Sequence, residues 1–319
     1  MLFLWIFISV ILFLSLAILT IAYYCYRRIF YSKPRRKLKD NEFELPVGEI
    51  YKKYQDEMIS WVKEARKLPH ETIEIKSFDK LTLRGKYYEY KKGAPIELLF
   101  HGYRGYGERD LSGGIERCFK LGRNALIVDQ RACGESEGHI ITFGIKESLD
   151  CLSWINFAIE KFGNNSQIIL TGISMGASTV MMVADKDLPS NVKYILADCG
   201  YRSPKEIIKK VIKDMKLPPQ LIYPFVKLGA KLFGHFNLEE NSPLDCLQKA
   251  KIPVIFIHGE DDDFVPCEMS KQLYKLCSSP KSLITIPNAG HGLCYPVDKE
   301  TYLKALKDFE KIWNKKLVN

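Results

Sequence analysis

The chain has 319 residues, which suits one domain of about 250 residues with its own hydrophobic core and one additional segment. Its formal net charge of +9 is concentrated near one end, because seven Lys and Arg residues and no Asp or Glu occur up to residue 39. Residues 40–319 therefore carry only about +2, and this composition excludes a nucleic-acid-binding domain.

The cysteines indicate a reducing compartment. There are nine, an odd number, and they are scattered through segments that read as core strands and helices. No Cys-x-x-Cys pair or Cys/His cluster has the spacing of zinc ligands. The sequence therefore predicts neither a disulfide framework nor a metal site.

The N-terminal segment predicts a membrane anchor. The 21 residues 2–22 carry no charge, which is enough to cross a hydrocarbon layer of about 30 Å as a helix. A cleaved signal peptide is the alternative, but it needs a basic start and small residues before the cleavage point. This chain has no basic side chain before Arg27, and bulky residues 23–26 follow the apolar run. We expect residues 1–26 to be an uncleaved transmembrane anchor.

A basic flank follows the expected anchor. Its members are Arg27, Arg28, Lys33, Arg35, Arg36, Lys37 and Lys39. The positive-inside rule predicts that this flank and the remaining chain stay in the cytoplasm of a single-pass membrane protein. The same run also suits binding of anionic lipid head groups. We expect residues 27–69 to form this flank and a linker with an amphipathic helix.

From residue 70 to the end, the patterns of strands and helices predict a single α/β domain. Residues 71–77 and 81–90 alternate apolar and polar side chains, which indicates an opening antiparallel pair. Strand and helix patterns then alternate through residues 96–200 and 252–316. This order predicts a mostly parallel sheet with helices on both faces. Residues 201–250 interrupt it and predict a helical cap.

The most informative motif is Gly172-Ile173-Ser174-Met175-Gly176, which lies between the apolar run 168–170 and a buried helix at 177–184. Gly-x-Ser-x-Gly between a strand and a helix is a nucleophile elbow, a turn so tight that the positions two before and two after the serine must be small. A serine hydroxyl attacks only when a base takes its proton and an acid orients that base.

His291 is the best candidate for the base. Three histidines follow the serine in the chain: His235, His258 and His291. His291 lies in a glycine-flanked loop after the apolar strand 282–286, where a mobile imidazole can reach the serine. His258 ends a buried strand, and we expect it to have a structural role there.

The string His258-Gly259-x-x-Asp262-x-x-Val265-Pro266 resembles the acid loop of α/β-hydrolases. The resemblance covers roughly residues 70–316 and is closest in kind to small single-anchor bacterial serine hydrolases of the esterase and lipase type. It implies the α/β-hydrolase fold for residues 70–319 and Asp262 as the triad acid. Spacing alone leaves its neighbours Asp261 and Asp263 open, and Asp198 after the preceding strand is a weaker alternative.

The resemblance also implies an oxyanion hole. Strand 96–100 runs into His101-Gly102-Tyr103, and similar turns present one backbone N–H to the oxyanion. The second N–H comes from the residue after the nucleophile. These positions are Tyr103 and Met175, whereas His101 is expected to brace the turn. Cys133, where relatives often carry histidine in the loop Asp129–Gly138, is expected to be a packing cysteine, with a reactive thiol as the alternative.

Two interpretations of the cap remain open. Residues 205–213 form an amphipathic pattern with a basic face, and residues 217–226 are largely apolar. The apolar side chains either line an acyl or aromatic pocket or pack the cap onto the main domain.

The expected function is hydrolysis of a small-molecule or lipid-derived ester at a membrane, through an acyl-enzyme, with no metal or organic cofactor. A thioesterase or serine peptidase uses the same intermediates and is the alternative among enzymes. A non-catalytic scaffold is the alternative outside enzymes. Small anchored relatives occur on either face of membranes, so an external domain is the alternative orientation.

Overall fold

The computed structural model describes residues 1–33, 39 and 41–316. Its centre is a sheet in which the described residues form eight strands in the order β1-β2-β4-β3-β5-β6-β7-β8. β1 pairs with β2 and β2 with β4 in antiparallel fashion, and all other neighbours are parallel. The strands are β1 (Glu71–Lys76), β2 (Thr82–Tyr88), β3 (Ile96–Phe100), β4 (Asn124–Val128), β5 (Ile168–Ile173), β6 (Val192–Asp198), β7 (Val254–Gly259) and β8 (Lys281–Ile286). The predicted fold class and the opening antiparallel pair are confirmed.

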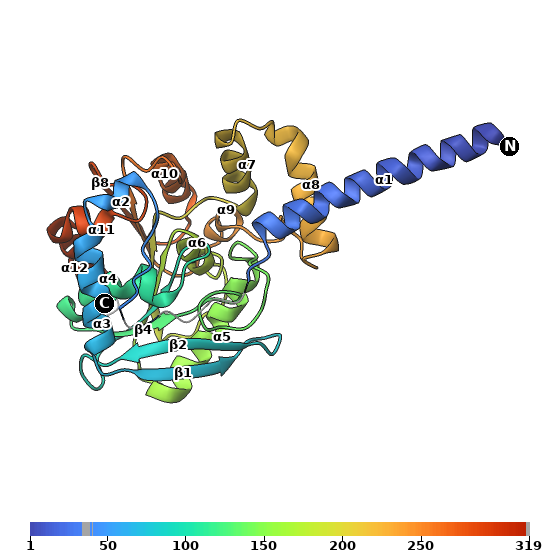
Figure 1. Ribbon diagram of the computed structural model, residues 1–319. Coiled ribbons are helices and arrows are strands. Elements are labelled where there is room, and N and C mark those ends of the chain that lie inside the picture. The colour runs from blue at the N-terminus through green and yellow to red at the C-terminus, as the bar shows by residue number, and fades with distance from the viewer. Residues whose placement is uncertain (34–38, 40, 317–319) are drawn as a thin grey trace.

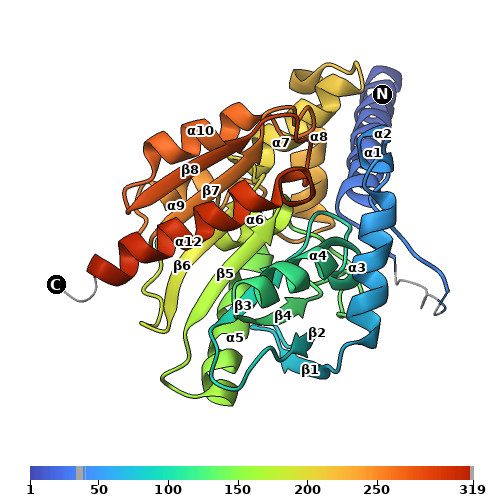
Figure 2. The same ribbon diagram turned by 90° about the vertical axis from the view of Figure 1, so that its left-hand side faces the viewer.

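Helices cover both faces of this sheet, and α12 and α4 lie across its front in Figure 2. Before the cap, the helices are α1 (Leu2–Ile29), α2 (Glu49–Lys52), α3 (Gln55–Lys67), α4 (Gly107–Lys120), α5 (Ile145–Phe162) and α6 (Met175–Met181). The cap holds α7 (Pro204–Asp214), α8 (Pro219–Leu232) and α9 (Pro243–Leu247), and α10 (Cys267–Leu276), α11 (Cys294–Val297) and α12 (Lys299–Lys316) follow it.

Alternation along the strands explains the two helical layers. Successive side chains of a strand point to opposite faces, so Leu98 and Phe100 of β3 pack with α5 and α6, whereas Leu99 packs with α3 and α4. The side chains of β7 alternate in the same way. Val254 and Phe256 lie in the core with α5 and α6, whereas Ile255 and Ile257 pack with α12. A strand buried on both faces reads as a continuous apolar run, as β5 and β7 do.

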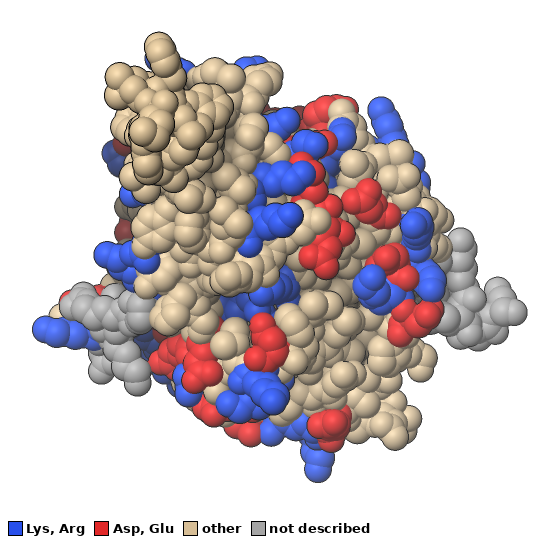
Figure 3. All heavy atoms as spheres, turned by 90° about the vertical axis from the view of Figure 1, so that its right-hand side faces the viewer, with Lys and Arg blue, Asp and Glu red and all other residues tan. Residues whose placement is uncertain are grey.

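α1 projects from the remainder of the molecule in Figure 1. By length and composition it is the one helix of the described residues that can cross a membrane, a test that a signal sequence also passes. Figure 3 views the molecule from the side of α1, whose exposed part forms an area without charged side chains. The helix continues beyond the expected limit at residue 26 to Ile29. Arg35, Arg36 and Lys37 of the basic flank lie outside the described residues.

The linker and the cap differ from their simplest expectation. The expected linker helix is divided into α2 and α3 by a turn at residues 53–54. In the cap, Tyr223, Val226 and Ala230 of α8 share a core with Tyr26 and Phe30. The apolar side of α8 therefore packs against the end of α1, a partner that the sequence analysis did not consider.

Candidate functional site

Ser174 occupies a strained turn between β5 and α6. Its φ of 57° and ψ of −118° lie outside the regions that non-glycine residues prefer, and its N–H donates to the Asp198 carbonyl at 2.8 Å. A Cβ on Gly172 would lie 2.1 Å from the Gly176 carbonyl, and a Cβ on Gly176 would lie 2.0 Å from the Phe100 carbonyl oxygen. The two glycines are therefore required for the turn to close, as the elbow motif predicts.

The structure brings Ser174, His291 and Asp262 into one hydrogen-bonded line. His291 Nε2 lies 2.9 Å from Ser174 Oγ, and His291 Nδ1 lies 2.7 Å from Asp262 Oδ2. An ionised carboxylate only accepts, so Nδ1 carries the proton and donates it to Asp262. The lone pair of Nε2 therefore faces the serine hydroxyl, which is the arrangement that general-base activation requires.

The environment of Asp262 keeps its carboxylate charged. Burial raises the pKa of this carboxyl, but hydrogen bonds from His258 and His291 outweigh burial and hold the pKa at about 2. Its other oxygen accepts the N–H groups of Phe264 and Val265 at 3.0 and 2.8 Å. The turn that follows β7 thus surrounds the carboxylate with donors on both oxygens.

His258 contributes more than the structural role expected from the sequence. Its Nε2 lies 2.8 Å from the Val265 carbonyl and 3.1 Å from Asp262 Oδ2, while Nδ1 lies 2.7 Å from Ser270 Oγ. Because a carbonyl only accepts, Nε2 carries the proton and Nδ1 accepts from the serine hydroxyl. The fully buried imidazole therefore orients the carboxylate that orients His291. The i,i+4 spacing of His258 and Asp262 is the signal that sequence analysis left unused.

The turn after β3 lies beside the serine. A Cβ on Gly102 would be in van der Waals contact with Ser174, 3.5 Å from its Cβ and 3.8 Å from its Oγ, which places this turn next to the proposed nucleophile. His101 braces the turn as expected: its Nε2 accepts the Gln130 N–H at 2.9 Å, and Nδ1 then donates to the Gly102 carbonyl at 2.7 Å. Among the described residues, the N–H groups of Tyr103 and Met175 have no protein acceptor within hydrogen-bonding distance.

Ser174, His291 and Tyr103 line a cavity of about 670 Å³. It runs between α4 and α11 and is covered by residues 46–51 and by α3. Its apolar lining includes Pro46, Val47, Ile50, Met58, Trp61, Leu99, Leu111, Ile173, Phe264 and Pro296. None of the described residues that line it comes from the cap at 201–250. Of the two interpretations of the cap, the structure therefore favours packing over lining of this pocket.

Two contributors to the site were missed by the sequence analysis. The Tyr51 hydroxyl donates to the His291 carbonyl at 2.9 Å, and Ile50 packs against Gly290, so the linker covers the histidine loop. The Phe264 ring lies edge-on to the His291 ring, with centroids 5.0 Å apart. The linker residues carry no motif, whereas Phe264 lies within the acid loop and was recognisable there.

The alternative site residues lie elsewhere. Asp261 and Asp263 are exposed, while Asp262 between them is buried. Asp198 accepts the Tyr302 hydroxyl at 2.9 Å, and burial raises the pKa of its carboxyl. His235 is exposed on the cap. These positions leave Asp262 as the carboxylate in contact with His291.

The cysteines agree with packing roles. All nine lie within the described part of the chain, and none forms a disulfide. Cys133 is buried in the core shared by the cap and α1. Cys199 is close enough to Asp262 and His291 for the three side chains to enclose a metal ion. Burial, however, raises the pKa of its thiol well above the ordinary value, and the other two groups already bond to each other.

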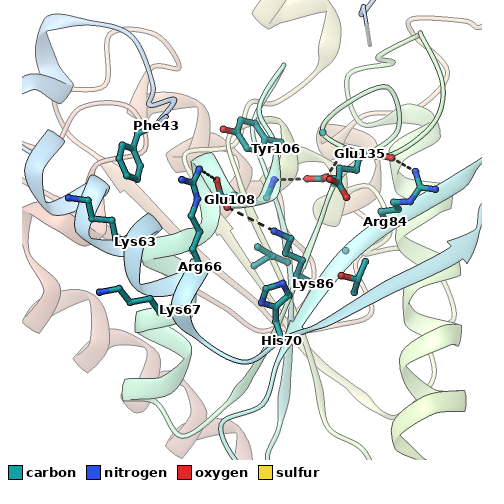
Figure 4. Close-up of a pocket in the computed structure, with 16 residues that line it drawn as sticks. Phe43, Lys63, Arg66, Lys67, His70, Arg84, Lys86, Tyr106, Glu108 and Glu135 are labelled. Carbon is teal, nitrogen blue, oxygen red and sulfur yellow. Dashed lines mark hydrogen bonds and ion pairs between the residues drawn. The ribbon is translucent and has the colours of Figure 1, made fainter. Parts of the chain in front are cut away.

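A second hollow, of about 610 Å³, lies between α3, β2 and the start of α4 (Figure 4). Basic side chains from α3 and β2 project into it, among them Arg66 and Lys86. Glu108 pairs with Arg66 at 2.7 Å and with Lys86 at 4.0 Å. Ser174, His291 and Asp262 are not among the residues that line this hollow. Its ion pairs join α3 and β2 through Glu108 of α4.

Comparisons with known proteins agree with this geometry. Residues 98–231 match the family model described as alpha/beta hydrolase fold. YqkD of Bacillus subtilis is 30% identical over 190 residues, which are 59% of this chain and 62% of YqkD, less than two thirds of that relative. Protein bem46 of Schizosaccharomyces pombe is 26% identical over 233 residues, 70% of this chain and 72% of bem46. The Pyrococcus furiosus esterase Pf2001 has a similar structure, with a TM-score of 0.65 at 22% identity, covering 89% of this chain and 99% of the esterase.

The family model, the structural likeness and the topology agree with one another. The matched region contains β3 to β6 and the elbow between β5 and α6. Ser174, Asp262 and His291 follow β5, β7 and β8, in the chain order Ser, Asp, His that is typical of this fold. The chain therefore has the α/β-hydrolase fold.

Proposed function

We propose that the protein is a serine hydrolase that cleaves carboxylic esters through a Ser174-His291-Asp262 triad. The observation that carries this proposal is the hydrogen-bonded line from Ser174 Oγ through His291 to an ionised Asp262, at 2.9 and 2.7 Å. This line opens into a largely apolar cavity of about 670 Å³, a size typical of small-molecule sites. Similarity in fold to an esterase supports the same reaction class.

In the proposed reaction, His291 Nε2 removes the proton of Ser174 as Oγ attacks the ester carbonyl carbon. The N–H groups of Tyr103 and Met175 bind the oxyanion that forms. When the tetrahedral intermediate collapses, the carbon–oxygen bond to the alcohol breaks, and the leaving oxygen takes the proton from Nε2. Water then attacks the acyl-enzyme, with its proton passing to Nε2, and the acid leaves as this proton returns to Ser174.

Asp262 stabilises the proposed imidazolium because it stays negatively charged. Its pKa of about 2 means that it takes no proton from His291 at neutral pH. His258 and the two backbone N–H groups hold it at the correct angle. The chemistry of these residues needs no electron transfer and no Lewis acid.

An ester series tests the proposal on the full-length chain in phospholipid nanodiscs. We expect p-nitrophenyl esters with acyl chains from acetate to palmitate to be hydrolysed, with a preference for chains that fill the apolar cavity. Ser174→Ala should lower kcat by a factor on the order of 10³ or more and abolish labelling by a fluorophosphonate. Ser153→Ala, on the outer side of α5, is the matched control and should leave both unchanged.

Three results would contradict the ester proposal. Full activity in Ser174→Ala would exclude this serine as the nucleophile. Fluorophosphonate labelling of Ser174 without hydrolysis of any ester would direct the search to thioesters and peptides. Absence of both would favour a binding role for the fold.

We also propose that α1 spans a membrane and that the hydrolase domain lies in the cytoplasm. The support is an apolar helix whose last turn carries Arg27 and Arg28, with further basic residues after it in the sequence. Full-length fusions at the C-terminus, expressed in a bacterial host, report the orientation. We expect a green fluorescent protein fusion to fluoresce in the membrane fraction and an alkaline phosphatase fusion to be inactive. An active phosphatase fusion would reverse the orientation, and a fluorescent soluble product would contradict the anchor.

A further inference from the structure

The last two turns of α1 belong to the folded domain. Residues 2–21 are almost entirely exposed, whereas Ala22, Tyr26 and Phe30 are buried. The helix crosses α8 at Gly229, where a Cβ would lie 2.4 Å from the Ala22 carbonyl oxygen. So close a crossing holds the end of α1 firmly against the cap.

The end of α1 needs hydrogen-bond donors from elsewhere. The last carbonyl groups of a helix have no partner within it. Here the Tyr103 hydroxyl donates to the Ile29 carbonyl at 2.5 Å. Arg104 Nη2 donates to the carbonyls of Arg28 and Tyr31 at 2.8 and 3.2 Å. A guanidinium is also a favourable charge at the negative end of a helix.

These two donors belong to the turn beside Ser174. Tyr103 follows Gly102 directly, and its backbone N–H is the proposed oxyanion donor. Arg104 has a φ of 55°, a left-handed conformation that a non-glycine side chain rarely adopts unless its surroundings impose it. The Tyr103 ring packs on Phe143 at 5.0 Å, and Phe143 packs on Phe30 at 5.8 Å. The turn therefore contacts the end of α1 through hydrogen bonds and through a shared aromatic core.

We infer that the C-terminal turn of α1 positions the oxyanion-hole turn, with the Tyr103 hydroxyl and Arg104 as positioning residues. This inference rests on the proposed function. α1 then has two roles in one helix: its exposed part is the proposed anchor, and its last two turns support the catalytic geometry. A shift of the end of α1 against the cap would therefore displace the backbone N–H of Tyr103.

This arrangement predicts a specific kinetic signature. An oxyanion hole acts in the transition state and contributes little to ground-state binding, so its displacement lowers kcat and kcat/KM equally. Loss of one donor costs about 10²–10³ in turnover, and a donor that is displaced rather than deleted should cost roughly tenfold. A purely structural contact would lower thermal stability and leave kcat per active site unchanged.

The test uses the full-length chain in phospholipid nanodiscs with p-nitrophenyl butyrate, and active sites are counted by fluorophosphonate titration. Tyr103→Phe removes the hydroxyl and keeps the ring and the backbone N–H. Gly229→Ala should displace α1 from the side of α8, and it substitutes no residue of the oxyanion turn. Tyr194→Phe is the matched control, because its buried hydroxyl also forms a hydrogen bond, to Glu310 of α12 at 3.2 Å, in a core that contains neither α1 nor the oxyanion turn.

We expect Tyr103→Phe and Gly229→Ala each to lower kcat roughly tenfold at unchanged KM, and the double variant to lose less than the product of the two. Tyr194→Phe should lower the melting temperature by a few degrees at unchanged kcat. Arg104→Met should behave like Tyr103→Phe, with partial rescue in Arg104→Lys.

Unchanged kcat in both Tyr103→Phe and Gly229→Ala, beside an active wild type, would overturn this inference and leave the proposed function intact. A fall in kcat for Tyr103→Phe alone would also overturn it, because the effect would then not pass through α1. A wild type that neither reacts with fluorophosphonate nor hydrolyses esters would overturn the proposed function and this inference with it.

Discussion

Asp262 retains its negative charge in a position where burial opposes ionisation. Its side chain is fully buried, yet four donors surround its two oxygens, two from the backbone and two from the imidazoles of His258 and His291. Hydrogen bonds to the charged form lower the pKa of a carboxyl, and here they outweigh desolvation. The chemistry of this residue therefore depends on the turn around it and on a histidine four residues earlier, near the end of β7.

The lowered pKa of Asp262 predicts how stability depends on pH. The ordinary pKa of an aspartate is 3.8, and the folded-state pKa is about 2. Because the folded-state value is the lower one, the carboxylate stabilises the fold above pH ~4, and this contribution is lost as the pH falls towards 2. We expect the difference in the free energy of unfolding between wild type and Asp262→Asn to shrink by about 2 kcal/mol between pH 6 and pH 2. Urea denaturation of the detergent-solubilised full-length chain measures it, and a constant difference would contradict the assigned pKa.

At the scale of elements, the cavity beside Ser174 is enclosed by the linker rather than by the cap. α3 and residues 46–51 close the space between α4 and α11, and Met58 of α3 lines it. The cap instead uses its apolar side against α1 and the segment around Phe143. Under the proposed function, the acyl chain would contact a segment that lies between the proposed anchor and the sheet in sequence.

A matched pair of substitutions distinguishes the linker from the cap. Met58→Trp adds bulk to the cavity and should lower kcat/KM for a p-nitrophenyl octanoate about tenfold relative to the acetate, because the longer acyl chain needs the filled space. Met215→Trp places the same side chain at an exposed position of the cap, 65% accessible, and should leave the ratio unchanged. The opposite pattern would move acyl binding to the cap.

Across the whole molecule, a buried ionic network joins distant parts of the chain. Glu97 of β3 is fully buried and pairs with Arg117 of α4 and with Arg123, which also binds Glu310 of α12 at 2.7 Å. Burial raises the pKa of Glu97, but the two arginines outweigh it and hold its pKa at about 2. The network thus connects β3 to α12, and its member Arg117 also lines the cavity beside Ser174.

Removal of the central charge should destabilise the whole domain. Glu97→Gln leaves two buried guanidinium groups without their shared partner, and we expect a loss of about 3–5 kcal/mol in the free energy of unfolding. Glu74→Gln is the matched control, since Glu74 also pairs with an arginine, Arg84, but on the surface. Its expected effect is below about 1 kcal/mol. Equal effects in urea denaturation would contradict a stabilising role of the buried network.

Much of the fold was predictable because its signals are local. The alternation in β1 and β2, the apolar runs of β5 and β7 and the small residues around Ser174 each act over a few positions. The acid loop is equally local, so Asp262 and His258 were recognisable together. The division of the linker into α2 and α3 and the end of α1 at Ile29 were not predictable. Where a helix ends depends on which hydrogen-bond donors reach its last carbonyl groups, and these come from distant parts of the chain.

The amino-acid sequence by itself determined the α/β-hydrolase fold, the candidate residues Ser174, His291 and Asp262, and the apolar N-terminal helix, since each depends on periodicity or short spacing. Tertiary structure alone decided which surfaces meet. It brought Tyr51 to the His291 loop, Tyr103 to the end of α1, and the cap to α1 instead of the cavity. The physical reason is that an apolar or hydrogen-bonding side chain specifies a kind of partner, whereas the choice among such partners depends on how the packed elements fit.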